Sequence, residues 1–295
     1  MFTYGSIIIP SDKKYCYLGI TLTLSGSLSL TMEELRKKGL RAYFSLKNLV
    51  DIRHLSVQAI LKLFDALILP VASYGCQIWF HKTAFMNQFV NRTFESRPTN
   101  CIAKIATDSI ERLHLRFLKW TLGVHKKASN IFCWGDSGRC PLLQKVAKQT
   151  VDYYERLDGM SLSNCNQLAR HAFEEQRHLA LPWFKNMSEL IELCASRNSI
   201  CQQSGQPYAV RSGEMVKLQL ENIFKQLWAK VLNESSKLRF YSQVKEVFEA
   251  YLRIPNRDVR KSVAILGSDP AATVSILKQP DTTAPLNTSP KQDAS

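Results

Sequence analysis

Apolar residues recur every three or four positions along most of this 295-residue chain, and this period predicts a mainly α-helical fold. The two clearest repeats are Leu35, Ala42, Leu46 and Leu49, and then Ile110, Leu113, Phe117 and Trp120. Thr31-x-x-Glu34 predicts a capping box before the first repeat, and Asp108-x-x-Glu111 predicts a cap before the second. Gly123 is expected to end the second helix as its C′ residue.

Residues 4–24 follow the two-residue period of β-strands instead. Residues 7–9 are three isoleucines, residues 10–12 have turn composition, and residues 15–22 alternate among β-forming side chains. We therefore expect a β-hairpin with one strand at 7–9, its turn at 10–12 and its second strand at 15–22.

The longest apolar tract covers residues 61–79 and contains two backbone breakers, Pro70 and Gly75. Proline removes a backbone donor, so we expect a kink or break at Pro70 in a core segment. The uncharged stretch 66–80 is shorter than the ~20 residues of a membrane-spanning helix, and the first residues lack a secretory pattern. We expect no membrane contact and an intracellular protein, nuclear or cytoplasmic and not secreted.

Turn-forming residues predict the remaining boundaries. Residues 92–107 and 130–140 are expected to be loops, and Pro141 is expected at the first position of a helix that stops at Gly159. Residues 161–236 show three or four helical patterns, and a last helix is expected at 237–253. Residues 267–295 are rich in Pro, Thr, Ser and Ala, a composition that predicts a disordered C-terminal tail.

The charge of the chain changes this picture from a generic helical protein to one suited to polyanions. It has 39 Lys and Arg against 25 Asp and Glu, a net charge of +14. Basic residues gather on two predicted helices and their ends: Arg36, Lys37, Lys38, Arg41 and Lys47 on the first, and Arg112, Arg116, Lys119, Lys126 and Lys127 on the second. Each could be an ordinary solvated residue, but together they favour binding to nucleic-acid phosphates.

Signals for a catalytic or metal centre are absent from the sequence. No two Asp residues are adjacent, and there is no glycine-rich phosphate loop. His171 and His178 are seven residues apart, about 10 Å along a helix, which is too far for one metal ion. The eight cysteines form no C-x-x-C pair, so we expect free structural thiols in a reducing compartment, and no metal or cofactor.

Five blocks of the sequence resemble LINE-type (non-LTR retrotransposon) reverse transcriptases. They are Tyr17-Leu18-Gly19-Ile20; Leu67-Ile68-Leu69-Pro70 with Tyr74-Gly75-x-x-Ile78-Trp79; Phe117-Leu118-Lys119 with Leu122-Gly123-Val124; Gly135-Asp136-Ser137-Gly138-Arg139-Cys140-Pro141-Leu142; and Lys237-Leu238-Arg239-x-Tyr241 with Tyr251-Leu252. Their order and spacing resemble the end of the palm, the thumb and the post-polymerase linker of that family.

The resemblance implies an architecture and a role. It implies an end-of-palm-like β-hairpin at 1–24, a thumb-like helical region at 25–107, a helical linker at 108–266, and the tail at 267–295. Tyr17, Leu18 and Gly19 would lie near a primer end, and the basic helices would grip a template–primer duplex. The catalytic palm with its Asp-Asp metal site would precede Met1, so we expect no polymerase activity from this chain alone.

Two alternatives to a non-catalytic nucleic-acid-binding fragment stay open at this point. The helices could form a scaffold for a protein partner, for instance a palm-containing polypeptide, because a thumb without its palm exposes an apolar patch. The chain could also be the product of a decayed retroelement with no selected function. The fold expected in every case is mainly α, a helical thumb and linker bundle with a short N-terminal β-hairpin and a disordered C-terminal tail.

Overall fold

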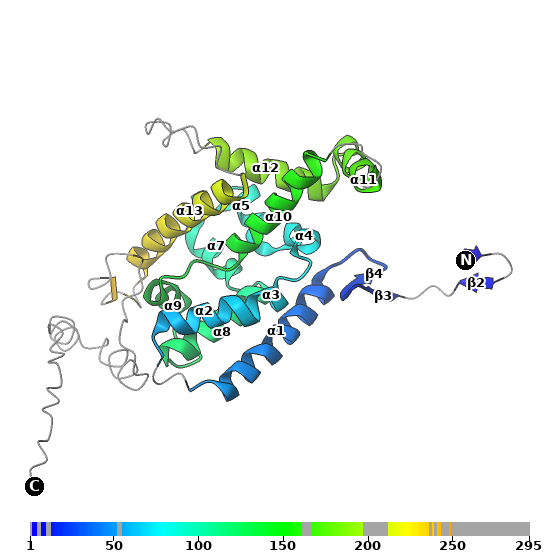
Figure 1. Cartoon of the computed structure of the whole chain (residues 1–295). Helices are drawn as coiled ribbons and strands as arrows, with labels where there is room; N and C mark the ends of the chain where they lie inside the picture. The colour runs from blue at the N-terminus through cyan, green and yellow to red at the C-terminus, as the bar shows by residue number, and fades with distance from the viewer. Residues whose placement is uncertain are drawn as a thin grey trace, which may run out of the picture.

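The computed structural model describes residues 2–4, 7–9, 13–51, 55–160, 167–196, 212–235, 238, 241–242 and 248. Within these ranges the protein is mainly α-helical with short N-terminal β-hairpins, as the sequence predicts (Figure 1). The predicted tail at 267–295 lies outside the described residues, and so does most of the predicted helix at 237–253.

The N-terminal strands pair differently from the prediction. β1 (Phe2–Tyr4) pairs with β2 (Ile7–Ile9), and β3 (Lys14–Tyr17) pairs with β4 (Ile20–Thr23), both antiparallel. The single strand predicted at 15–22 is therefore wrong, because it is a hairpin with a two-residue turn. Leu18 and Gly19 take φ of 46° and 81° in that turn, the left-handed conformation that matches the twist of a tight hairpin.

α1 (Ser29–Leu49) begins beside β4, and the capping box predicted there is also wrong. The Thr31 hydroxyl donates to the Thr21 carbonyl oxygen at 2.5 Å, and the Thr21 hydroxyl donates to the Glu34 carboxylate at 2.5 Å. Both side chains that would have capped the helix instead attach it to the hairpin. Leu35 and Leu46 are buried as predicted, whereas Leu49 is exposed.

The long apolar tract forms a chain of short helices: α2 (Val57–Leu63), the π-helix η2 (Phe64–Ile68), α3 (Leu69–Ala72), α4 (Cys76–Trp79) and the 3₁₀-helix η3 (Phe80–Lys82). The helical path continues through Pro70, which lies in the first turn of α3, where a missing backbone N–H is tolerated. The sharp change of direction, 65°, comes after Ala72 and includes Gly75 at φ 61°. The tract is a bent core segment, as predicted, but its break lies at Gly75 and not at Pro70.

The protein has no membrane-spanning candidate consisting of one helix among its described residues. The bent pair Val57–Ala72 and Cys76–Lys82 has the necessary length and composition only when its two parts are taken together.

Both predicted loops in the middle of the chain contain helices. α5 (Ala84–Val90) is followed by α6 (Thr93–Ser96) and α7 (Pro98–Ile105), where residues 92–107 had been expected to be irregular. Cys101, Ile102 and Ile105 of α7 enter the core, and their burial stabilises a helix too short for a clear periodic signal. α9 (Asn130–Ser137) likewise replaces the loop expected at 130–140 and ends at Gly138, φ 62°.

α8 (Ser109–Leu122) matches the prediction closely at its C-terminus. Gly123 has φ 73°, and the N–H of Val124 donates to the Lys119 carbonyl oxygen at 3.0 Å, which is a Schellman pattern. At its N-terminus Asp108 occupies the predicted cap position, but its carboxylate accepts no hydrogen bond from the first turn of its own helix. Its carboxylate accepts from the N–H groups of Ala84 and Phe85, both at 2.9 Å, and so caps α5.

The last described helices are α10 (Leu143–Asp158), α11 (Gln167–His178), α12 (Pro182–Ser196) and α13 (Ser212–Glu234). α10 packs along α13, and the two lie above α8 and α1 in Figure 1. Gly159 ends α10 as predicted, but Pro141 precedes the helix by two residues instead of opening it. One hydrophobic core contains side chains from every described α-helix except α11.

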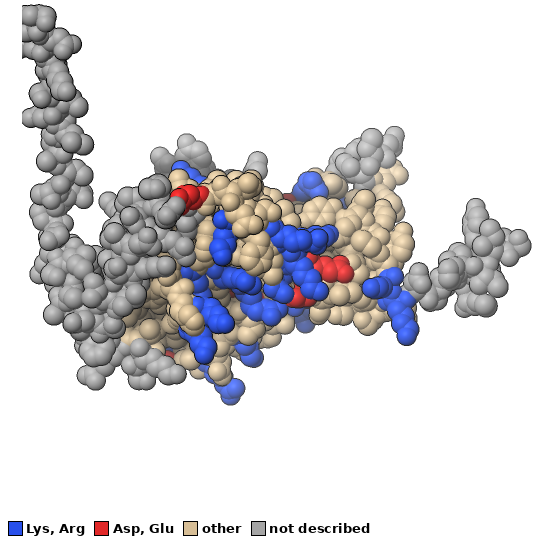
Figure 2. All heavy atoms as spheres, turned by 90° about the horizontal axis from the view of Figure 1, so that it is seen from below, with Lys and Arg blue, Asp and Glu red and all other residues tan. Residues whose placement is uncertain are grey.

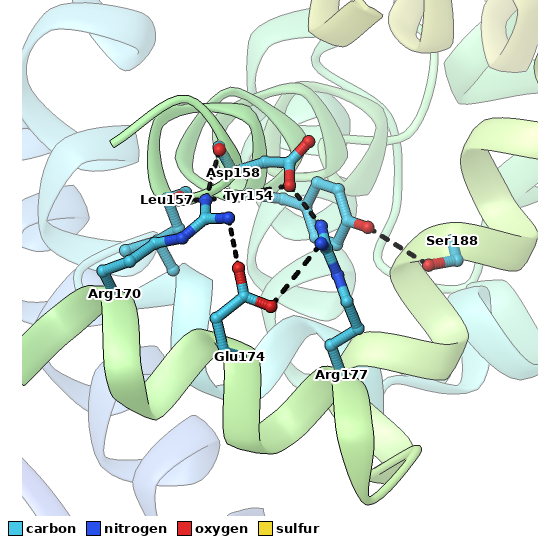
Figure 3. Close-up of polar contacts among 7 residues, drawn as sticks. All are labelled: Tyr154, Leu157, Asp158, Arg170, Glu174, Arg177 and Ser188. Atoms are coloured by element: carbon cyan, nitrogen blue, oxygen red, sulfur yellow. Dashed lines mark hydrogen bonds and ion pairs between the residues drawn. The ribbon is translucent and has the colours of Figure 1, made fainter. Parts of the chain in front are cut away.

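α10 and α11 are joined by a polar network (Figure 3). The Arg170 guanidinium donates to the Leu157 carbonyl oxygen at 3.0 Å and to the Glu174 carboxylate, while Arg177 pairs with Asp158 and with Glu174. Glu174, one of the two acidic residues between His171 and His178, therefore has structural partners. Among the described residues no group of three or more His, Cys, Asp and Glu is arranged to hold a metal ion.

Candidate nucleic-acid interface

α1 and α8 pack closely along one another, and a glycine makes this possible. A Cβ atom at Gly39 would lie 2.5 Å from Cδ2 of Leu113 on α8 and 3.3 Å from Cβ of Ala72 on α3. Farther along, the Tyr43 ring lies 5.6 Å from the Trp120 ring, between centroids. Since these contacts follow the same order on both helices, α1 and α8 run in the same direction.

This packing brings together the two basic clusters that the sequence places about seventy residues apart. On α1 the exposed basic residues are Lys37, Lys38, Arg41 and Lys47; on α8 they are Arg112 and Arg116; and Lys126 and Lys127 are exposed just after α8. We call this set the α1–α8 basic face. Figure 2 views the molecule from the side along which α1 lies and shows Lys and Arg spread across it with few acidic side chains.

Two of the predicted basic residues, Arg36 and Arg112, form ion pairs with one carboxylate. Glu33 forms ion pairs with Arg36 at 2.5 Å and with Arg112 at 3.3 Å. The hydrogen bond from Arg36 is the main reason that the pKa of Glu33 is below its usual value. Arg36 is half-buried, whereas Arg112 keeps about half of its side chain exposed (53%). Arg36 therefore orders the face more than it offers charge to a ligand.

The other acidic residues of these two helices do not oppose the basic side chains. Glu34 accepts a hydrogen bond from Thr21, and Glu111 is fully buried. Within the described part of the chain, Lys37, Arg41 and Lys47 form no ion pair. Their charge is therefore available to an external anion.

Lys119 holds the loop after α8 in place. It is half-buried, and its Nζ donates to the Lys126 carbonyl oxygen at 3.0 Å. Because α8 runs parallel to α1, this loop lies toward the end of the face that carries Lys47. The exposed Lys126 and Lys127 extend the basic face in that direction.

The face also contains an aromatic residue that the sequence analysis did not select. Phe44 is 42% exposed on α1, and the guanidinium carbon of Arg116 lies 5.1 Å from its ring centroid. The spacing of the sequence already contains a signal for it, since Phe44 is three residues after Arg41 and three before Lys47.

The residues predicted to resemble a primer grip lie at the N-terminal side of α1. Tyr17 is exposed at the end of β3, and Leu18 and Gly19 form the hairpin turn. The Tyr74 hydroxyl donates to the Leu18 carbonyl oxygen at 2.9 Å, and a Cβ at Gly75 would lie 2.6 Å from Cδ1 of Ile20. Two blocks of the family resemblance, more than fifty residues apart, are thus in direct contact.

An open groove of about 750 Å³ lies beside this turn. Its walls come from the hairpin, from the Pro70–Gly75 bend and from α10, and they are mostly apolar. Leu18, Tyr74 and Ile78 line the groove and are strongly exposed. The groove lacks the cations of the α1–α8 basic face, so the two surfaces differ in the chemistry they offer.

The block Gly135–Leu142 serves the core. Asp136 accepts a hydrogen bond from the Tyr241 hydroxyl at 2.6 Å, and Arg139 forms an ion pair with Asp65 at 2.7 Å. Lys145 joins the same carboxylate at 2.9 Å, and the two cations hold the pKa of Asp65 down although its burial raises it. These contacts attach α9 and α10 to η2, behind the basic face.

A buried carboxylate supports α8 from within. Glu111 accepts from Nδ1 of His114 at 2.8 Å, from the Trp134 indole at 2.9 Å and from the Leu142 N–H at 2.8 Å. The predicted structural thiols are consistent with this packed interior, since burial raises the pKa of Cys133 and of Cys140 to about 12 in both cases. Cys165 and Cys201 lie outside the described residues.

In comparisons with protein-family models, curated proteins and solved structures, nothing matched this chain.

Proposed function

We propose that this protein is a non-catalytic nucleic-acid-binding fragment of the LINE-type reverse transcriptase kind, which holds nucleic acid through phosphate contacts on the α1–α8 basic face. The observation that carries the proposal is the packing of α1 on α8. It joins two basic clusters from distant parts of the sequence into one surface, and among the described residues only Glu33 forms an ion pair with one of its exposed cations. A continuous row of exposed cations is suited to phosphate backbones, since each contact releases a counterion.

The family resemblance supports the same role. The turn at Leu18 belongs to the palm-like hairpin and the bend at Tyr74 to the thumb-like region, and the two are in direct contact. The proposal includes no polymerase chemistry for this chain, because nucleotidyl transfer depends on clustered carboxylates that hold two metal ions. The sequence contains no adjacent Asp residues that could supply such a cluster.

The test is a binding titration with a fluorescein-labelled RNA–DNA duplex, followed by fluorescence anisotropy between about 50 and 300 mM NaCl. The informative variant carries Lys37→Gln, Arg41→Gln and Lys47→Gln. We expect the log–log salt slope to become shallower by about one unit for each cation removed, and the affinity at low salt to fall.

The matched control carries Lys104→Gln, Lys225→Gln and Lys230→Gln, which are exposed on α7 and α13. It loses the same net charge from other faces and is expected to keep the wild-type slope. Equal losses in the two triple variants would show that total charge and not the α1–α8 basic face governs binding. Salt-independent or absent binding by the wild-type protein would refute the proposal.

A second candidate function is favoured by the open groove. Leu18 is 72% exposed and Ile78 is 46% exposed at its rim, which is unusual for apolar residues that line one hollow. A scaffold that receives a palm-containing polypeptide in this groove would explain them. Ile78→Asp should then abolish co-purification with a separately expressed palm fragment and leave duplex binding unchanged, whereas retained co-purification would rule this function out.

A further inference from the structure

The α1–α8 basic face contains an exposed aromatic side chain, which contacts to the phosphate backbone of a nucleic acid do not require. Phe44 is the only exposed aromatic residue of α1 and α8, since Tyr43 and Phe117 are buried and Trp120 is half-buried. It lies in the middle of the basic residues of α1 and not at their margin. Phosphate contacts need charge and hydrogen-bond donors, which a phenyl ring does not supply.

Cations surround this ring on three sides. Arg41 and Lys47 are its neighbours at three residues before and after on the same helix, where side chains lie about 5–6 Å apart between their Cβ atoms. Arg116 approaches from α8, with its guanidinium carbon 5.1 Å from the Phe44 centroid and 6.0 Å from the Tyr43 centroid. The α1–α8 contact therefore places a guanidinium group over an aromatic ring, and both members are exposed.

An exposed phenyl ring and a guanidinium plane are the two kinds of side-chain surface on which unpaired nucleobases stack. Bases inside a duplex are already stacked on each other. This pair of side chains can therefore stack only on a base that is itself unpaired. The flanking cations supply the phosphate contacts on both sides of such a base. The chemistry of the pair therefore matches one nucleotide of a single strand.

We propose that Phe44 and Arg116 form a stacking site for an unpaired base, and that the α1–α8 basic face binds a single-stranded segment of nucleic acid through this site. The proposal rests on the proposed function and names its substrate more closely: a single strand, or an unpaired stretch adjoining a duplex. Every base has a π-face, so the site accepts RNA and DNA strands of any sequence.

The experiment separates stacking from electrostatics with two single strands of equal charge. One is oligothymidine of about 12 nucleotides, within the range of known single-strand sites, and the other is an abasic strand with the same number of phosphates. The wild-type protein is expected to bind oligothymidine about fivefold or more tightly than the abasic strand, with oligouridine showing the same preference. A blunt duplex serves as a third ligand.

Two variants test the pair itself. Phe44→Leu keeps an apolar side chain on the helix, and Arg116→Lys keeps the charge but loses the planar group. Both are expected to reduce the preference for the base-containing strand toward one, while the salt slope on the blunt duplex stays as in the wild type. The controls are Leu49→Ala, which removes another exposed apolar side chain of α1, and Arg156→Lys, which removes an exposed guanidinium group of α10, and both should retain the preference.

The outcomes distinguish this inference from the proposed function. Equal affinity of the wild-type protein for abasic and base-containing strands, with salt-dependent binding to both, would overturn the stacking site and leave the phosphate-binding face intact. An undiminished preference in Phe44→Leu would overturn it as well. Absence of binding to all three ligands would remove the proposed function and this inference together.

Discussion

The position that controls the α1–α8 basic face most directly is Gly39, which carries no charge. It is buried where α1 crosses α8 and α3, and an added Cβ would lie 2.5 Å from Cδ2 of Leu113. Replacing it by valine adds that Cβ and two further carbon atoms at the closest point between the helices. The substitution therefore tests whether the separation of α1 from α8 determines both stability and binding.

The expected cost follows from two opposing effects. Glycine is a poor helix former, so Gly39→Val gains about 0.4 kcal/mol in helix propensity. Overpacking a well-filled interface costs ~1–3 kcal/mol, and this site lies at the upper end because Leu113 is itself fully buried and Ala72 is 3.3 Å from the added Cβ. We expect a net loss of about 2 kcal/mol in the free energy of unfolding, together with weaker nucleic-acid binding.

Guanidinium denaturation followed by circular dichroism measures the first quantity, and anisotropy with the labelled duplex measures the second. Ser45→Val is the matched control, because Ser45 is exposed on the same helix and the change should alter stability by less than about 0.5 kcal/mol. If Gly39→Val were as stable as the control, the close helix contact would be wrong. If it were destabilised but bound nucleic acid with unchanged affinity, the relative position of the two helices would not matter for binding.

Three further results are expected. Glu111→Ala leaves three buried donors without an acceptor and should cost ~3 kcal/mol or more in denaturation, whereas Glu33→Ala, which breaks exposed ion pairs, should cost less than about 1 kcal/mol. Burial raises the pKa of Asp108 from 3.8 to about 6. The folded state thus binds this proton more tightly than the unfolded state. As the pH falls from 6 to 4, the free energy of unfolding of the wild type should therefore rise relative to that of Asp108→Asn. A rise in this difference on raising the pH would contradict the raised pKa of Asp108. Tyr74→Phe removes the bond to Leu18 and should speed amide exchange in β3 and β4, and unchanged exchange would show that the bond does not hold the hairpin.

The predictions that succeeded were those carried by neighbouring residues. The apolar repeat of α8 and its end at Gly123 are both visible within fifteen residues of sequence, as is the end of α10 at Gly159. The sequence does not predict the hairpin turn at Leu18, because leucine rarely adopts a positive φ. Its conformation is supported instead by Tyr74, which is 56 residues away and bonds to its carbonyl oxygen.

Short elements failed for a related reason. α7 has eight residues, and helices of that length gain their stability from burial in the core and not from propensity. Thr31 and Glu34 have the spacing of a capping box, yet the hairpin offers them Thr21 as a partner instead. A local motif identifies side chains that can form hydrogen bonds, whereas the tertiary structure determines which partners they bond to.

For the candidate site, the sequence was sufficient to identify the basic residues, because charge and helical period are local properties. Lys37, Arg41 and Arg116 were all recognisable without coordinates. The tertiary structure alone decided that two of these helices share one face, that Glu33 also pairs with Arg112, and that the guanidinium of Arg116 lies over the ring of Phe44. Those facts depend on contacts between side chains about seventy residues apart, and such contacts are made by packing around Gly39, which no periodicity in the sequence encodes.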